Sequence, residues 1–81
     1  MKQPAADEAI AAALMDLAME RGAGKTFCPS EVARILAADW RLLMPEVRRV
    51  AADLPLAATQ KGVSVDPVTA KGPIRLGLIP T

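Results

Sequence analysis

Apolar residues recur with helical spacing in residues 39–56, which predicts a helix with one buried face. The predicted inward positions are Val47, Val50, Ala51 and Leu54. Pro45 suits the first helical position, and the preceding turn can also be helical, with Asp39 as its cap. The opposite face carries Arg48 and Arg49, so this helix is predicted to present guanidinium groups outward. Alternatively, Arg49 pairs with Glu46 or Asp53 on an ordinary solvated surface.

Two further helices are predicted before this segment, over residues 4–21 and about 29–38. The first opens at Pro4 with acidic residues in its first turn, and Gly22 is expected to follow its C-terminus. Its inward stripe is Ile10, Ala13, Leu14, Leu17 and Ala18. The second opens at Pro29, with Glu31 supporting its N-terminus and Arg34 outward. Its inward residues are predicted to be Val32, Ile35 and Leu36.

The first helix is also apolar on the side away from its predicted core stripe. This outer face consists of Ala11, Ala12, Met15 and Met19. A helix that is apolar on two sides usually has two neighbours. The second neighbour is either a symmetry mate in a homodimer, the C-terminal strand or a larger protein partner. Alternatively, the exposed alanines and the two methionines have no binding role, since apolar residues are common on protein surfaces.

After residue 55 the apolar period changes from 3.6 to 2, which predicts strands. A strand over 56–60 precedes a turn at Lys61 and Gly62, then a short extended stretch at 63–65, a loop to Pro73 and a terminal strand over 74–79. Residues 25–27 predict another short strand. The expected fold class is therefore α+β, mainly α. It is a winged helix with a three-helix helix-turn-helix core and a C-terminal β-hairpin wing, forming one domain over 4–79 with tails at 1–3 and 80–81.

Composition limits the function classes. With 81 residues and 52% hydrophobic content, the chain predicts a single small domain. Its two aromatic residues are Phe27 and Trp40, and Trp40 is expected to anchor the core. The net charge of +1 gives no strong overall attraction to polyanions, so nucleic-acid binding needs a local basic patch. One cysteine, no signal peptide and no apolar run of about 20 residues favour a cytoplasmic protein that does not enter a membrane.

Five short motifs occur in the order that this fold requires: CPSEVAR from Cys28, DWRLLMPEVRR from Asp39, TQKG from Thr59, VDP from Val65 and KGPIRL from Lys71. Together they resemble a bacterial family of small proteins catalogued only as a domain of unknown function. The resemblance covers most of the chain and implies a winged-helix fold. It implies no catalytic residues. The sequence departs from the expected pattern at Pro55, where a glycine is expected between the third helix and the next strand.

Enzymatic chemistry has little support in the sequence. The chain contains no histidine, and its one cysteine is insufficient for a zinc site. Gly24-Lys25-Thr26 resembles the end of a phosphate-binding loop, but Met19 occupies the position of the required first glycine. Cys28 near a helix N-terminus is expected to be a capping or buried residue rather than a nucleophile. We therefore expect no enzyme activity, no cofactor and no metal.

The remaining functional signal is a set of basic and polar residues on the third helix and the wing. In a winged helix, the third helix enters the major groove of DNA and the wing contacts phosphate or the minor groove. The predicted nucleic-acid-binding residues are Arg34, Arg41, Arg48, Arg49, Thr59, Gln60, Lys61, Lys71 and Arg75. The hypothesis is therefore a double-stranded DNA-binding protein, such as a transcriptional regulator. The alternative is a protein-interaction or dimerisation module that uses the outer face of the first helix. Arg41 and Arg75 have a structural alternative, pairing with carboxylates such as Asp39 and Asp66.

Overall fold

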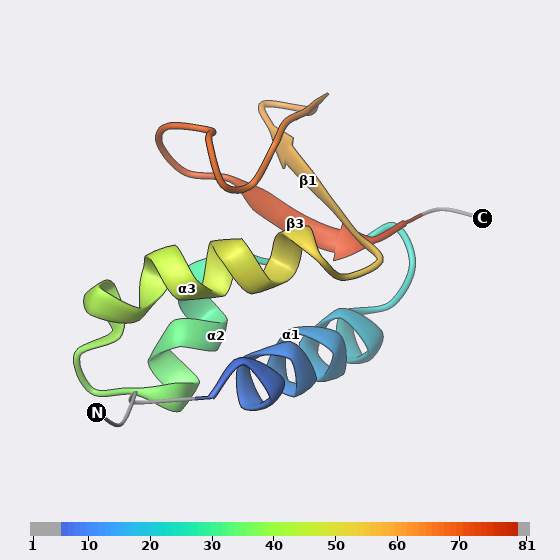
Figure 1. Cartoon of the computed structure of the whole chain (residues 1–81). Coiled ribbons are helices and arrows are strands. Elements are labelled where there is room, and N and C mark those ends of the chain that lie inside the picture. The colour runs from blue at the N-terminus through green and yellow to red at the C-terminus, as the bar shows by residue number, and fades with distance from the viewer. Residues whose placement is uncertain (1–5, 80–81) are drawn as a thin grey trace.

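The computed structural model describes residues 6–79, which form three helices and a small antiparallel sheet in an α+β arrangement. The elements, in chain order, are α1 (Asp7–Arg21), α2 (Pro29–Leu36), α3 (Trp40–Ala52), β1 (Leu56–Gln60), β2 (Val63–Ser64) and β3 (Arg75–Leu78). The helices form one layer and the sheet covers one side of it (Figure 1). The α+β class predicted from the change of period is confirmed. The predicted tails at 1–3 and 80–81, and the predicted start of the first helix at Pro4, lie outside the described residues.

The helix ends follow local chemistry. Ala6 is extended, so α1 begins at Asp7. Gly22 closes α1 with a φ of 87°, a left-handed value that suits glycine, and its N–H donates to the Ala18 carbonyl. At α2, the Glu31 carboxylate accepts a 3.0 Å hydrogen bond from the Cys28 N–H, as a first-turn glutamate should.

The placement of Pro45 at the start of the third helix is wrong. The helix begins at Trp40 after Asp39, and Pro45 lies inside it. The turn that precedes Pro45 is therefore helical, as the sequence analysis allowed. Proline has no N–H to donate to the carbonyl of Arg41, four residues earlier. Both residues are exposed, so water can satisfy that carbonyl.

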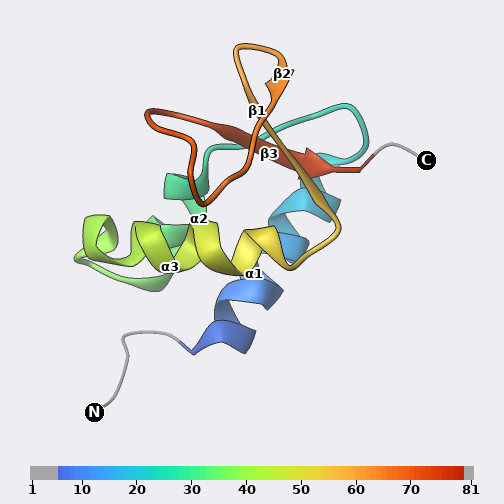
Figure 2. The same cartoon turned by 45° about the horizontal axis from the view of Figure 1, so that its top comes forward.

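The strands pair in the order β2-β1-β3. Lys61 and Gly62 have positive φ values of 52° and 81°, as a tight hairpin turn between β1 and β2 requires. One edge of β3 pairs with β1, and the other edge pairs with Phe27 through an isolated bridge. The strand predicted at 25–27 is therefore reduced to this one pairing. From β2 the loop to β3 curves back over α3 (Figures 1 and 2).

The core lies between the helices and the sheet. Its fully buried larger side chains include Ile10, Leu14, Phe27, Val32, Val47, Ile74 and Leu76. Of the inward stripe predicted for α3, Val47, Val50 and Ala51 are buried, whereas Leu54 lies beyond the end of the helix and is half-buried against the core. Two predictions about the core are wrong. Ile35 is 68% exposed, because α2 buries Val32 and Ala33 instead, and Trp40 is only half-buried at the edge of the core.

The outer face predicted on α1 is narrower than the sequence suggested. Ala11 packs against the core, and Met15 is half-buried. Ala12 is exposed, and Met19 is the one large side chain of this face that is mainly exposed, at 60%. Within residues 6–79, no helix has the length and apolar character needed to cross a membrane.

Candidate nucleic-acid interface

The corner between α2 and α3 brings two arginines together on one aromatic ring. The guanidinium carbons of Arg34 and Arg41 each lie 4.4 Å from the centroid of the Trp40 ring. Both arginines are exposed, and among residues 6–79 neither forms a salt bridge. Cation–π contacts orient a guanidinium without neutralising its charge. In place of the alternative pairing of Arg41 with a carboxylate such as Asp39, Arg41 stacks on Trp40.

Arg48 connects α3 to the loop between β2 and β3. Its two terminal nitrogens donate hydrogen bonds to the carbonyl oxygens of Ala70, at 2.7 Å, and Gly72, at 2.6 Å. The side chain is half-buried beneath the loop rather than fully outward. These acceptors are neutral, so the positive charge is retained at a fixed place beside Lys71. Arg48 therefore acts mainly as a structural link within this surface.

Arg49 is neutralised by two acids. It contacts Glu46, three residues earlier on α3, at 2.6 Å and Asp7 at the start of α1 at 2.7 Å. The pairing with Glu46 that the spacing allowed is confirmed, and the one with Asp7 joins α1 to α3. Hydrogen bonding from Arg49 holds the pKa of the Asp7 carboxyl below its ordinary value. Arg49 is thus the predicted site residue with the least charge to offer a ligand.

The polar residues of the wing are held by the wing itself. The side-chain amide of Gln60 donates to the carbonyl oxygens of Lys71 and, at 3.2 Å, Pro73. Thr59 is half-buried in β1, between Ser64 on one neighbour and Arg75 on the other. Lys61 is exposed in the hairpin turn, and Lys71 is exposed in the loop.

Arg75 joins β3 to the connector before α2. Its guanidinium donates to the hydroxyl of Thr26 at 3.1 Å and to the carbonyl of Thr26 at 3.0 Å. In the structural alternative, Arg75 would pair with a carboxylate such as Asp66, but Asp66 instead accepts a hydrogen bond from the Val68 N–H in its own loop. Arg75 remains exposed and without a salt bridge in the described part of the chain.

Four of the predicted site residues meet at a shallow hollow of about 280 Å³ at the base of the wing. Its lining consists of Thr59, Gln60, Lys61, Pro73, Ile74 and Arg75. Hydrogen bonds link this hollow to α3, because Gln60 bonds the loop at Lys71 and Arg48 bonds it at Ala70 and Gly72. The helix, loop and hairpin therefore form one connected surface.

The sequence analysis did not predict that Arg34 and Arg41 stack on the Trp40 ring. A signal was available, since Trp40 directly precedes Arg41 and lies six residues after Arg34, on the far side of a short connection. The described residues also hold no group of three or more histidine, cysteine, aspartate or glutamate side chains placed to bind a metal ion.

Two comparisons with known proteins bear on this chain. A family model described as "Protein of unknown function (DUF3253)" matches residues 7–79, which is nearly the whole chain. A search of curated proteins gives no match.

Proposed function

The chain belongs to this family of proteins of unknown function, and we propose that it is a winged-helix protein that binds double-stranded DNA. A binding role is favoured over an enzymatic one, because the chain has no histidine and several exposed arginines and lysines lie on α2, α3 and the wing. The family description supplies no function, so the proposal rests on the surface of the chain itself.

The winged-helix part of the proposal is supported by the order and pairing of the elements. Only residues 37–39 separate α2 from α3, as in a helix-turn-helix pair. A strand position at Phe27 precedes these helices, and a hairpin with a long loop follows them. In this arrangement α3 corresponds to the groove-binding helix and residues 61–73 to the wing.

The observation that carries the DNA-binding proposal is the bridge that Arg48 makes between α3 and the wing loop. The bridge fixes the loop over the helix, so cations on the two elements keep a constant spacing. Arg41 on α3 and Lys71 in the loop are exposed, as are Arg34 on α2 and Lys61 in the hairpin turn, and within residues 6–79 none of them forms a salt bridge. A rigid array of unneutralised cations is suited to the regular phosphates of a duplex.

Each residue then has a distinct role. Arg34 and Arg41, oriented by the Trp40 ring, contact the DNA at the N-terminal end of α3. Lys61 and Lys71 contact phosphates from the wing, and Arg48 sets the position of the wing. Arg49 is left out of the interface because Asp7 and Glu46 neutralise it.

A fluorescence anisotropy titration with a labelled 30-base-pair duplex at low salt tests the proposal. We expect Arg41→Ala to weaken binding by roughly 1–3 kcal/mol. Arg21→Ala is the matched control, because it removes the same charge from a residue that pairs with Glu31 away from this surface. The proposal fails if the folded wild-type protein binds no duplex, or if both variants lose affinity equally.

A further inference from the structure

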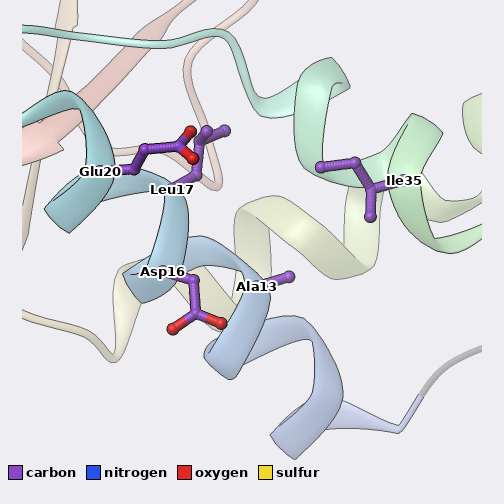
Figure 3. A pocket seen from close by; sticks show the side chains of 5 residues that line it. All are labelled: Ala13, Asp16, Leu17, Glu20 and Ile35. Carbon is purple, nitrogen blue, oxygen red and sulfur yellow. The ribbon is translucent and has the colours of Figure 1, made fainter.

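A second surface lies between α1 and α2. It is an open groove of about 230 Å³, lined by Ala13, Asp16, Leu17, Glu20 and Ile35. Figure 3 shows Ala13 and Leu17 on α1 pointing toward α2, with Ile35 across from them. The groove is separate from the basic surface and from the predicted outer face of α1.

The apolar part of this groove is unusually exposed at Ile35. This side chain is 68% exposed, whereas Leu17 across the groove is only 8% exposed. Covering apolar surface stabilises a complex by roughly 25 cal/mol per Å². Ile35 and Ala13 therefore offer surface that gains free energy when a partner covers it.

The rim of the groove is acidic. Asp16 and Glu20 are exposed and lie one helical turn apart on α1. Neither forms a salt bridge within residues 6–79, whereas Asp7, Glu31 and Glu46 each pair with an arginine. The nearest arginine in sequence to Ile35 is Arg34, whose guanidinium stacks on Trp40 instead. The groove thus combines an apolar floor with two unneutralised carboxylates.

We propose that this groove binds a basic amphipathic helix of another protein, with one apolar side chain seated against Leu17 and Ile35. Lysine or arginine residues flanking that side chain would meet Asp16 and Glu20. The groove is smaller and more open than sites for small molecules, which usually enclose about 300–1,000 Å³. A single anchored side chain on a helix suits such a surface, and charge complementarity selects a basic partner.

The test uses two labelled synthetic helical peptides with the same leucines, one carrying lysines and the other glutamates beside them. Anisotropy is measured in 0.15 M salt with the full chain. We expect binding of the lysine peptide alone, and a loss of at least about tenfold in the double variant Asp16→Lys/Glu20→Lys and in Ile35→Ser.

The matched control is Glu8→Lys/Asp53→Lys, which makes the same change in net charge at exposed acids outside the groove. Screening at this salt should limit its loss to less than about threefold. Circular dichroism establishes that each variant is folded. The proposal is overturned if the control loses as much as the groove variants, or if neither peptide binds.

Sedimentation of the chain without peptide tests whether a second copy of the chain occupies the groove. A wild-type dimer that Ile35→Ser dissociates would assign the groove to a second copy and overturn the proposal of a separate partner. A monomer in both cases supports it. Duplex binding by Asp16→Lys/Glu20→Lys is measured in parallel, so failure of the groove and failure of the DNA proposal are seen separately.

Discussion

At the scale of single residues, the arginines show how strongly partners determine what a charge can do. Arg49 is neutralised by two carboxylates, Arg48 donates to two backbone carbonyls, and Arg34 and Arg41 stack on one indole ring. In the sequence all four are equivalent basic residues. Their contacts leave Arg34 and Arg41 with both charge and exposure available for a ligand.

Gly77 is the glycine at which an added side chain would make the closest contact. A Cβ atom at this position of β3 would lie 2.7 Å from the carbonyl oxygen of Lys25. We expect Gly77→Ala to lower the free energy of unfolding by about 1–3 kcal/mol, because the connector must move away from the sheet. Urea unfolding followed by circular dichroism measures this. Ser64→Ala, at an exposed position of β2, should stay within about 0.5 kcal/mol of the wild type, and an equal loss in both would contradict the explanation.

Glu31 gives the fold a pH-dependent contribution. The backbone N–H of Cys28, and then the guanidinium of Arg21, hold the pKa of the Glu31 carboxyl below its ordinary value of 4.5. A lowered folded-state pKa stabilises the protein above the unfolded pKa, and this stability is lost as the pH falls through the folded value. Glu31→Gln should therefore be less stable than the wild type at pH 7, and the difference should shrink below about pH 4.5. A difference in unfolding free energy that is constant from pH 7 to pH 3 would refute this.

At the scale of elements, the position of the wing depends on α3. The carbonyls of the loop after β2 are held by Arg48 from the helix and Gln60 from β1. Asp66 adds a local hydrogen bond to the Val68 N–H. The loop between β2 and β3 is therefore held in place by side chains of α3 and β1.

Arg48→Ala should release this loop without unfolding the helices. Loss of two hydrogen bonds from a charged donor costs about 1–3 kcal/mol, and the loss acts locally because the core beneath stays packed. Hydrogen exchange should become faster at the Ala70 amide, which bonds the Asp66 carbonyl at 2.9 Å, while the Val47 amide keeps its protection. Arg21→Ala, whose salt bridge lies elsewhere, provides the comparison. Unchanged exchange at Ala70 would show that Arg48 does not hold the loop.

At the scale of the whole molecule, a net charge of +1 leaves little attraction to DNA at long range. Under the proposed function, the attraction must come from the local cations of α2, α3 and the wing. The α1–α2 groove, whose two carboxylates form no salt bridge within residues 6–79, is opposite in charge to the proposed DNA-binding surface.

The salt dependence of duplex binding reports how many cations take part. Each phosphate contact adds about −0.9 to the slope of log K against log salt concentration. Contacts from Arg34, Arg41, Lys61 and Lys71 predict a slope of about −3.6, and Lys71→Ala should make it shallower by about 1. Titrations between 20 and 200 mM salt measure it. A slope near zero, or one that Lys71→Ala leaves unchanged, would exclude the wing loop from the interface.

Most of the secondary structure followed from local pattern. Apolar spacing predicted the three helices, and the glycine and lysine of the hairpin turn predicted the end of β1 at Gln60. These features depend on residues within a few positions of one another, where backbone preferences and side-chain periodicity act. Pro45 was the local misreading, because the packing of α3 outweighs one lost backbone hydrogen bond.

The candidate sites depended on contacts between distant residues. Arg48 finds its acceptor Ala70 22 residues away, Arg49 reaches Asp7 over 42, and Arg75 reaches Thr26 over 49. Ile35 is exposed because α2 turns Val32 and Ala33 inward, a choice made by packing against α1 and α3. Periodicity shows which residues share a face of one element. The partner that each face meets is set by how the elements pack, so the pairing of charges emerged only from the folded chain.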